Sequence, residues 1–383
     1  MPNFAQYYLT DQKIIAEIEQ GLRATYFVEY EAGFLETELG IQDLQANVFN
    51  RYNNSLRHVV PWVARHIDLS GKKVVEIGSG TGSSTAAFAH FVDSVHGYDI
   101  HGPSVEGARK RLEILGITNT RIDIIKGEEL VGRLGADHQS GVDIMLLFAV
   151  LEHQTTEERI ATIATCWQLL KPGGLLVVVE TPNLLQYFDF HTSLLPFCHL
   201  LPTDMYARYA QFSPRNGFNN AFRNADSLAK EELDLAITRW GRGASYHDFE
   251  LALGQTYGRQ LVANGFEKEM LDWVGVCLEE EVLRYYIDRR GLAIPKAFSR
   301  VALNFILQKG DDVTPCDDSN VPGYMHLTSP EEILLRDAHI KDLELHLQSR
   351  VQHLENILNS KRWKLINALS SPYRSIKNLL TKP

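Results

Sequence analysis

The chain has little cysteine and no closely spaced cysteine pair. Its four cysteines, Cys166, Cys198, Cys277 and Cys316, are scattered over 383 residues without a C-x-x-C spacing. This pattern speaks against a disulfide framework and against a cysteine-based zinc site. No tight set of Asp, Glu and His with ligand-like spacing stands out either, so no metal is predicted.

Long apolar runs are also missing. No run approaches the roughly 18 residues that indicate a membrane-spanning helix. The first residues lack the basic start and apolar core of a secretory signal. Hydrophobic residues at 44% and charged residues at 22% are ordinary for a soluble globular protein. The sequence therefore predicts a cytoplasmic location.

Basic residues are fewer than acidic ones, 38 against 48, and the C-terminal segment is an exception to this balance. The formal net charge is −10, and nucleic-acid binding needs clustered Lys and Arg, so no nucleic-acid partner is expected. Residues 361–383 carry six Lys and Arg side chains and no acid, mixed with Trp363, Tyr373 and several Leu and Ile residues. Such a tail can lie on an anionic bilayer, which predicts peripheral contact with the inner face of the membrane. A frayed, solvated tail is the alternative.

What the chain does have is a glycine-rich turn after an apolar strand. Residues 74–82 read V-V-E-I-G-S-G-T-G, with Glu76 followed by Gly78, Gly80 and Gly82. Glycine lets another molecule approach the backbone, and the helix that follows offers unpaired N–H groups at its start. The third glycine comes one residue earlier than in the dinucleotide-binding pattern G-x-G-x-x-G, which weakens a pyrophosphate-binding interpretation.

This turn resembles motif I of the class I S-adenosylmethionine-dependent methyltransferases, E/D-x-G-x-G-x-G, at every fixed position. A second strand ends in Asp99, and in that family this acid accepts hydrogen bonds from the ribose hydroxyls of the cofactor. A third strand leads to Gly127-Glu128-Glu129, where the family places an acid that faces the adenine amino group.

Two later segments extend the resemblance. Residues 142–153 resemble motif IV running into an L-E-H ending, and residues 169–179 resemble the L-K-P-G-G turn and the strand after it. The resemblance implies an enzyme that uses S-adenosyl-L-methionine as its cofactor. The cofactor-binding residues that it implies are Glu76, Gly78, Ser79, Gly80, Gly82, Asp99, Ile100, Glu128, Glu129 and Phe148.

The apolar pattern predicts the order of the elements. Residues 71–180 alternate short apolar strands with helical stretches, the pattern of a parallel sheet covered by helices on both faces. The resemblance implies an α/β fold with a Rossmann-like seven-stranded sheet whose last strand is antiparallel. The last two strands are expected at 269–277 and 301–307, after a helix end and turn at 261–266. The expected units are a helical N-terminal lid at 1–70, a cofactor-binding core at 71–180, an inserted substrate cap at 181–260, the last two strands of the core at 261–309, a linker at 310–330, a coiled-coil-like helix at 331–360 and a basic amphipathic tail at 361–383.

The segment 331–360 carries a short heptad pattern. Ile333, Ile340, Leu347 and Leu354 recur every seven residues. This spacing predicts a coiled coil that joins copies of the chain into a homo-oligomer. A helix packed on its own globular domain would show the same stripe, but the acidic linker before it favours a projecting helix.

Acceptor chemistry is expected in the loop after the fifth strand. A hydroxyl acceptor must lose its proton as it attacks, so a base near the cofactor is valuable. The loop carries His191 and His199, and His191 is the first candidate base, with His199 and His153 as the others. The alternative is that these histidines only hold an irregular loop through backbone hydrogen bonds. His247, in the cap, could reach the site only if the cap folds back.

Two further resemblances suggest a pathway. Residues 191–202 are similar to an H-T-S-x-L-P-F-x-H-x-L-P stretch of sugar and polysaccharide methyltransferases, and residues 360–374 to endings of bacterial surface-polysaccharide enzymes. They imply O-methylation of a sugar in bacterial surface polysaccharide biosynthesis. A nicotinamide-dependent sugar oxidoreductase and a non-catalytic scaffold are the alternatives. The early third glycine speaks against the first, and the intact Glu76, Asp99 and Glu128 speak against the second.

Overall fold

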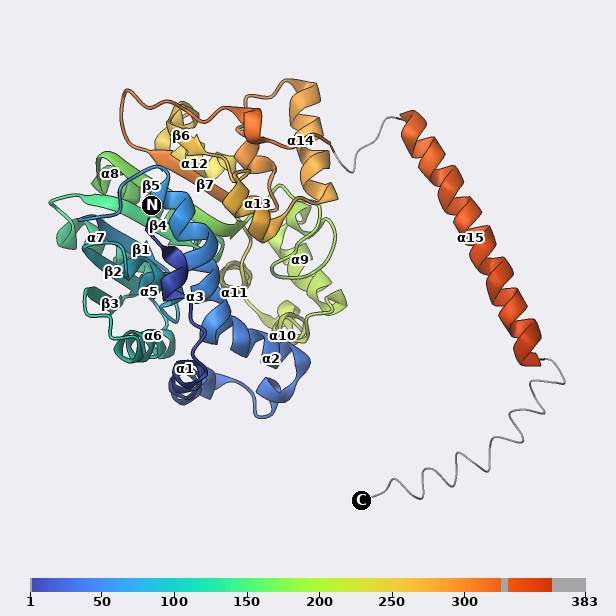
Figure 1. The fold of residues 1–383 in the computed structure, drawn as a ribbon, viewed down its shortest axis with the longest axis horizontal. Coiled ribbons are helices and arrows are strands. Elements are labelled where there is room, and N and C mark those ends of the chain that lie inside the picture. The colour runs from blue at the N-terminus through green and yellow to red at the C-terminus, as the bar shows by residue number, and fades with distance from the viewer. Residues whose placement is uncertain (1, 325–329, 360–383) are drawn as a thin grey trace, which may run out of the picture. The chain divides into compact units, whose positions relative to one another are not determined.

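The computed structural model describes residues 2–324 and 330–359, and its backbone contacts divide the chain into the units Met1–Gly323 and Tyr324–Pro383. Within the described residues, the first unit is built on a seven-stranded sheet of order β3-β2-β1-β4-β5-β7-β6 (Figure 1). Strands β1 to β5 run parallel, and β7 is antiparallel to both of its neighbours. The predicted Rossmann-like methyltransferase fold is therefore confirmed. The strands are β1 (Lys73–Ile77), β2 (Ser94–Asp99), β3 (Thr120–Ile124), β4 (Val142–Phe148), β5 (Leu170–Pro182), β6 (Leu261–Ala263) and β7 (Ala302–Gln308).

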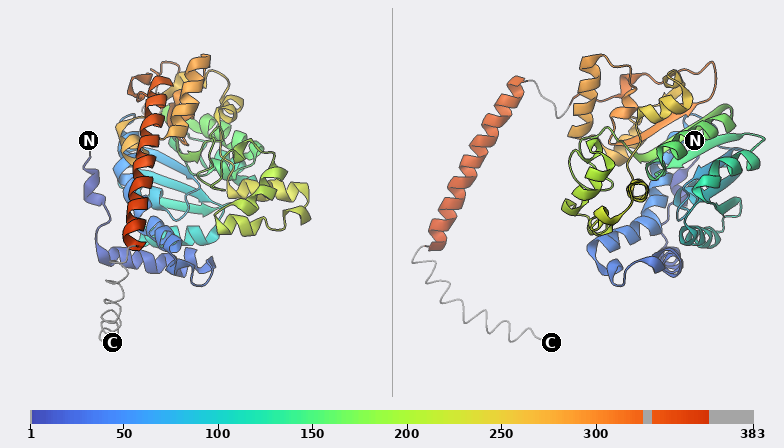
Figure 2. Two further views of the ribbon diagram at one scale, coloured as in Figure 1. Left: turned by 90° about the vertical axis from the view of Figure 1, so that its right-hand side faces the viewer. Right: turned by 180° about the vertical axis from the view of Figure 1, so that it is seen from behind.

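Helices cover both faces of the sheet (Figure 2). Successive strand residues point to opposite faces, so Val74 and Ile144 belong to one apolar core while Val75 and Met145 belong to the other. Both faces are buried, which explains why the strands are nearly continuous runs of Val, Ile and Leu. The first core contains side chains of α1 (Gln12–Ala24), α2 (Glu38–Gln45), α3 (Arg51–Asn54), α4 (Val60–Ala64), α5 (Ser83–Ala89), α6 (Gly102–Ile114) and α13 (Lys268–Val274), and the second contains side chains of α7 (Leu130–Asp137), α8 (Thr156–Leu169) and α12 (Tyr246–Leu253).

The helical run from α2 to α4 contains two π-helical segments, η4 (Ala46–Asn50) and η5 (Ser55–Val59). Such segments occur frequently at functional sites. Arg111 of α6 fixes this run against the glycine turn, because its buried guanidinium donates to the carbonyl oxygens of Thr81 at 2.8 Å and Val48 at 2.9 Å. The N-terminal layer is thereby held beside the carboxyl ends of the strands.

The chain between β5 and β6 forms an inserted cap. Part of it has a small apolar core of its own, which includes Cys198, Tyr206, Phe218 and Ile237. Several aromatic side chains of the cap therefore serve packing. The cap helices of this core are α9 (Thr203–Tyr209), α10 (Asn216–Ala221) and α11 (Lys230–Trp240), while α14 (Leu278–Arg290) lies between α13 and β7 in the chain.

The sixth strand lies one element earlier than the sequence predicted. It is β6 (Leu261–Ala263), which was expected as a helix end, and the predicted strand at 269–277 is mostly helix α13. The physical reason is a capped turn: the Glu267 carboxylate accepts the N–H groups of Asn264 and Gly265, each at 3.0 Å. This turn ends β6 after three residues and starts α13. The seventh strand lies within one residue of its expected position.

The second unit contains one long helix, α15 (Pro330–Asn359). Of its described side chains, Leu343, Leu347, Val351 and Leu354 are exposed. The predicted helix is present, and its pairing with a second copy stays a prediction. The predicted basic tail lies outside the described residues.

None of the helices in the described ranges is both long enough and apolar enough to cross a bilayer.

Short 3-10 segments connect these elements. Those used below are η6 (Gly127–Glu129), which follows β3, and η7 (Leu151–His153), which follows β4. The others are η1 (Phe4–Tyr7), η2 (Tyr26–Glu29), η3 (Phe34–Glu36), η8 (Cys198–Leu200), η9 (Ala210–Phe212), η10 (Ala225–Ser227), η11 (Tyr257–Gln260), η12 (Lys296–Ser299) and η13 (Asp318–Asn320).

Candidate active site

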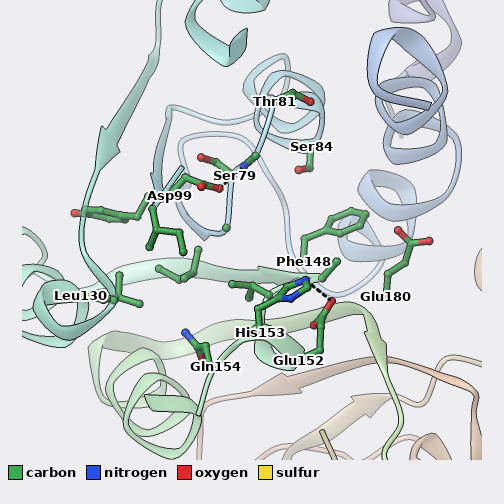
Figure 3. Close-up of a pocket in the computed structure, with 18 of the residues that line it drawn as sticks. Ser79, Thr81, Ser84, Asp99, Leu130, Phe148, Glu152, His153, Gln154 and Glu180 are labelled. Atoms are coloured by element: carbon green, nitrogen blue, oxygen red, sulfur yellow. Dashed lines mark hydrogen bonds and ion pairs between the residues drawn. The ribbon is translucent and has the colours of Figure 1, made fainter. Parts of the chain in front are cut away.

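A cavity of about 830 Å³ lies where the carboxyl ends of β1, β2, β4 and β5 meet the N-terminal helices and the cap. Ligand crevices of open α/β sheets occur at this edge, and the volume is within the usual range for small-molecule sites. Figure 3 shows one side of the cavity formed by Ser79 and Asp99 and another formed by Phe148, Glu152 and His153. We call these sides the cofactor end and the acceptor end.

The glycine turn forms the cofactor end with its backbone. Gly78 has φ +77°, and a Cβ there would lie 2.8 Å from the Val150 side chain. Gly80 has φ +51°, and no atom lies within 4 Å of the position of its missing Cβ. Its N–H donates to Asp99 Oδ2 at 2.7 Å. The turn therefore offers open backbone to a ligand and fixes the carboxylate at the end of β2 beside it.

Polar and apolar groups next to the turn fit a nucleoside cofactor. Among the described residues, the buried Oγ atoms of Ser79 and Ser83 have no hydrogen-bond partner, and both residues line the cavity. Ile100 also lines it and is 62% exposed, an apolar surface suited to a flat ring. Free hydroxyls, helix-start N–H groups, a carboxylate and an apolar wall together match S-adenosylmethionine better than an apolar ligand.

Two of the predicted cofactor residues, Glu76 and Gly82, support the turn from outside the cavity lining. Glu76 is buried, does not line the cavity, and accepts the hydroxyl groups of Ser84 and Thr85 at the start of α5. Burial raises the pKa of Glu76 to about 7. Gly82 is also outside the lining, and a Cβ there would lie 2.8 Å from Ala108. Their expected contacts with the cofactor stay predictions.

The acids after β3 do not line the cavity either. Glu128 and Glu129 belong to η6, and the lining at this point is formed by Lys126, Gly127 and Leu130 instead. Sequence reasoning missed these three because the family pattern marks the acid and not its neighbours. The predicted contact of Glu128 with an adenine amino group stays a prediction.

Two non-glycine residues with positive φ mark the start of the acceptor end. Ala149 follows β4 with φ +47°, Glu180 lies in β5 with φ +52°, and both line the cavity together with Phe148. Each such conformation costs on the order of 1–3 kcal/mol and is typical of functional sites. Burial raises the pKa of Glu180, while its backbone N–H donates to Asn304 Oδ1 at 2.9 Å.

The structure brings two of the three predicted catalytic histidines together. His153 of η7 and His191 of the loop after β5 line the cavity, with ring centroids 5.6 Å apart. Glu152 lies beside both: its Oε1 is 3.8 Å from His153 Nε2 and 3.9 Å from His191 Nε2. Burial lowers the pKa of both histidines and raises the pKa of Glu152 to about 8.

The third predicted histidine has another environment. The side chain of His199 is 4% exposed, does not line the cavity, and has its Nε2 3.9 Å from Asp189 Oδ1. His247 does not line the cavity, and its Nδ1 lies 3.1 Å from Ser245 Oγ at the start of α12. The structure therefore separates these two histidines from His191.

Asp189 positions the loop that carries His191. This buried carboxylate accepts the N–H groups of Thr192 and Ser193, each at 2.8 Å, and the Tyr206 hydroxyl at 2.8 Å. These bonds and the nearby His199 outweigh burial and lower the pKa of Asp189. The loop is thus held by an ionised carboxylate of its own.

Two arginines at the acceptor end come from distant parts of the chain. Arg239 of α11 pairs with Glu158 at 2.7 Å and donates to the carbonyl oxygen of His153 at 2.6 Å. Arg51 of α3 lines the same cavity. Sequence reasoning missed both because no local pattern links α3 or α11 to the end of β4.

Comparison with known proteins agrees with this geometry. A family model described as a methyltransferase domain matches residues 75–176, which run from β1 into β5. A ubiquinone biosynthesis O-methyltransferase of Azoarcus sp. is 30% identical over 173 residues, which cover 45% of this chain and 70% of that protein. The chain belongs to the class I S-adenosylmethionine-dependent methyltransferases. The predicted family and its cofactor, S-adenosylmethionine, are confirmed, and the nicotinamide alternative is dropped.

Other relatives match shorter parts of the chain. A ubiquinone biosynthesis O-methyltransferase of Stutzerimonas stutzeri is 31% identical over 121 residues, which cover 32% of this chain and 48% of that protein. This chain thus spans about half the length of the first curated relatives that it matches. Among solved structures, CalS10, an amino pentose methyltransferase of Micromonospora echinaspora, is 19% identical, with a TM-score of 0.30 over 37% of this chain and 56% of that chain.

Proposed function

We propose that this protein transfers a methyl group from S-adenosylmethionine to a hydroxyl of a small polar molecule or glycan. The first candidate acceptor is a sugar of a bacterial surface polysaccharide. The observation that carries the proposal is a single cavity with the glycine turn and Asp99 at one end and Glu152, His153 and His191 at the other. The relatives' name, O-methyltransferase, supports oxygen as the methylated atom.

The cofactor end holds the donor. The open backbone at Gly80 and the hydroxyls of Ser79 and Ser83 are available to the polar parts of the cofactor, and Asp99 to its ribose hydroxyls. Ile100 offers an apolar wall. When bound, S-adenosylmethionine supplies a methyl group on a positively charged sulfonium. The protein then needs mainly to align the acceptor with that methyl group, and alignment can supply most of the rate.

The acceptor end removes a proton. As the acceptor oxygen bonds to the methyl carbon, the sulfur keeps the electron pair of the broken bond and the hydroxyl proton must leave. His191 is the first candidate base and His153 the second, because both are neutral and line the cavity. His199 remains the third, although the loop would have to move to expose it. Arg51 and Glu180 are charged groups that can orient a polyhydroxylated acceptor.

Incubation with methyl-labelled cofactor tests the acceptor. Sugar nucleotides, surface glycans and intermediates of ubiquinone biosynthesis would be offered in parallel, and labelled products identified by mass spectrometry. The third group is the second candidate because of the relatives' name. Label on a sugar oxygen supports the first candidate, and label on a ubiquinone intermediate replaces it with the second. Label on nitrogen or carbon contradicts O-methylation.

We also propose that the chain acts as a homo-oligomer and touches the membrane. The exposed Leu347, Val351 and Leu354 of α15 support helix pairing. The composition of residues 361–383 supports contact with anionic lipid.

A further inference from the structure

Three side chains of ligand type converge at the acceptor end. Glu152 and His153 are neighbours in η7, and Figure 3 shows the Glu152 carboxylate turned toward the His153 ring. One oxygen of Glu152 and one nitrogen of each of His153 and His191 lie within 4.8 Å of one another. Sequence reasoning predicted no metal, because His191 lies far along the chain from the other two.

Hydrogen bonds fix the proton of His153 on Nδ1. This atom lies 2.9 Å from the carbonyl oxygen of Arg239. A carbonyl oxygen only accepts, so Nδ1 must carry the hydrogen. In the neutral ring the other nitrogen carries no hydrogen. Its Nε2 therefore presents a lone pair on the side of Glu152.

The same reasoning applies to His191. Its Nδ1 lies 2.9 Å from Thr192 Oγ1, and that hydroxyl donates its only hydrogen to the carbonyl oxygen of Gly241 at 2.7 Å. Nδ1 is therefore the donor, and Nε2 of His191 also presents a lone pair. Metal-binding histidines are held in this way, by a hydrogen bond from the ring nitrogen that does not bind the ion.

The carboxylate between these nitrogens lacks a partner. Glu152 is completely buried, and within the described ranges neither of its oxygens has a hydrogen-bond partner. A buried carboxyl group without a hydrogen-bond partner is costly. The distances of 3.8 and 3.9 Å to the two Nε2 atoms are too long for hydrogen bonds. Ligand atoms at about 2.1 Å from a tetrahedral zinc ion lie roughly 3.4 Å apart, so each of these two pairs must close by about half an ångström for one ion to bind them.

We propose that Glu152, His153 and His191 bind one divalent transition-metal ion of the Zn²⁺, Mn²⁺ or Co²⁺ class. Imidazole ligands favour these ions over Mg²⁺ and Ca²⁺, which prefer oxygen. Three protein ligands leave positions open toward the cavity, as in catalytic metal sites. The acceptor hydroxyl would bind there, and the ion would lower its pKa so that it gives its proton to water in the cavity, with the two histidines acting as ligands and not as bases.

The surroundings are compatible with a cation. Two arginines near the three side chains are paired with acids, Arg239 with Glu158 at 2.7 Å and Arg159 with Asp248 at 3.5 Å. Arg215 donates to the carbonyl oxygen of His191 at 2.6 Å, and its guanidinium carbon lies 5.3 Å from the centre of the Trp240 ring.

Another observation concerns the packing of the second ring. Gly241 has φ +111°, and a Cβ there would lie 2.9 Å from the ring of His191. The segment that follows α11 therefore comes close enough to hold this ring in a single orientation. The cap thus builds the proposed metal site as well as covering it.

A second group of one histidine and two carboxylates differs from the proposed metal site because its carboxylates are already paired. His96, Asp123 and Asp137 also lie within 4.8 Å of one another. Their carboxylates are already paired, Asp123 with Arg121 at 2.5 Å and Asp137 with Arg133 at 2.8 Å. The ligand atoms of this group thus have partners, whereas those of Glu152 have none among the described residues.

Metal titration of the full-length chain tests the proposal. The purified protein is stripped with a chelator and titrated with Zn²⁺ against an indicator dye, and with Co²⁺, whose visible spectrum reports nitrogen and oxygen ligands. One ion should bind per chain. His191→Ala, His153→Ala and Glu152→Gln should each weaken the affinity by more than about 100-fold, since loss of an outer-shell partner alone costs 10- to 100-fold.

Matched controls separate ligand loss from misfolding. His247→Ala and Glu157→Gln, outside the cavity, should bind the ion like the natural chain. Thr192→Val removes the partner of His191 Nδ1, together with the bond of that hydroxyl to Gly241, and keeps all three ligands, so it should weaken metal affinity by about 10- to 100-fold. The ion should raise the thermal midpoint of the natural chain and leave that of the Glu152→Gln variant unchanged. Glu152→Gln also removes a buried carboxylate, so it should fold without metal.

The metal site rests on the proposed function, but different results would contradict the metal site and the methyltransferase function. If the stripped chain binds no Zn²⁺ or Co²⁺, or if the three ligand variants bind as tightly as the controls, the metal site is wrong. Binding of S-adenosylhomocysteine to the stripped chain, measured by calorimetry, tests the methyltransferase function alone. If methyl transfer persists in chelator, the histidine base is the mechanism and the metal proposal is overturned.

Discussion

The cofactor end and the acceptor end of the cavity are built in different ways. At the cofactor end, Gly78 and Gly80 follow β1, and Asp99 and Ile100 lie at the end of the neighbouring strand β2. The N–H group of Gly80 donates to the Asp99 carboxylate. At the acceptor end, ionisable side chains come from η7, from the loop after β5, from α3 and from α11. Backbone groups therefore form much of the cofactor end, whereas side chains form most of the acceptor end.

The two ends also differ in how their polar groups are satisfied. Asp99 accepts two backbone N–H groups, from Gly80 at 2.7 Å and from His101 at 2.8 Å. At the acceptor end, Glu152 has no partner among the described residues, and Glu180 is held at positive φ. The unpartnered groups of the cofactor end are the hydroxyls of Ser79 and Ser83, whereas the acceptor end combines backbone strain with a buried carboxyl group that has no partner among the described residues. Such departures from local rules are typical of functional sites.

The largest expected effect is at the cofactor end. Asp99→Ala removes a carboxylate whose hydrogen bonds to N–H and hydroxyl groups are each worth about 1.5–3 kcal/mol. The Kd for S-adenosylhomocysteine, measured by calorimetry, should rise by about 100-fold or more. Asp93→Ala, an exposed acid outside the cavity, is the control and should leave the Kd unchanged. An unchanged Kd in Asp99→Ala would show that the cofactor residues are misassigned even though the family is right.

The next largest expected effect is on the free energy of unfolding, and it comes from Glu76, which supports the glycine turn. Burial raises the pKa of Glu76 to about 7 from 4.5. The folded chain thus holds this proton more tightly than the unfolded chain. Its contribution to stability is therefore greatest at low pH and falls as the pH rises through 7. Relative to Glu76→Gln, the free energy of unfolding of the natural chain should fall by about 2–3 kcal/mol between pH 5 and pH 8.

Urea unfolding of both proteins at the two pH values measures this difference. Other buried acids, such as Glu152 and Glu180, are common to both chains and cancel in the comparison. A difference that does not change with pH would mean that Glu76 is already ionised near pH 5 in the folded chain, stabilised by the hydroxyls of Ser84 and Thr85.

The contrast between the two ends also explains what the sequence could predict. The turn at Gly78 to Gly82 and the acid of β2 are local patterns, so the cofactor end and most of the sheet could be predicted. Glu152 was overlooked because its role depends on His191, which the cap loop brings to it. His191 lies near Glu152 because Asp189 holds the loop and Gly241 leaves room for the ring. No local sequence pattern identifies either of these two residues.

The error at the sixth strand has a related cause. Leu261–Ala263 is only three residues long, too short for a clear apolar alternation. Its pairing with β7 makes it a strand, and that pairing joins residues that lie far apart in the chain. The strand was expected at 269–277 because residues 261–266 were interpreted as the helix end and turn that the family places before its sixth strand.

A smaller effect tests the strain at the acceptor end. Glu180→Gly and Glu180→Ala both remove the carboxylate, but only glycine tolerates φ +52° without cost. The free energy of unfolding should therefore be about 1 kcal/mol higher for the glycine variant. At Glu17, in the middle of helix α1, the same pair should show the opposite order, with alanine more stable by about 1 kcal/mol. Equal stability of the two Glu180 variants would remove the claim of strain.

The smallest effect on either end is expected from removing the second unit. Backbone contacts divide the chain at Gly323, and the described residues that line the cavity belong to the first unit. Deletion of residues 328–383 should therefore leave the Kd for S-adenosylhomocysteine within about twofold, because it keeps all of these lining residues. The same deletion should lower the mass found by light scattering and abolish binding to vesicles that contain anionic lipid, since apolar heptad positions and clustered cations are lost. An unchanged mass would remove the coiled-coil proposal. A weakened Kd together with a lowered mass would instead mean that a second copy helps to complete one end of the cavity.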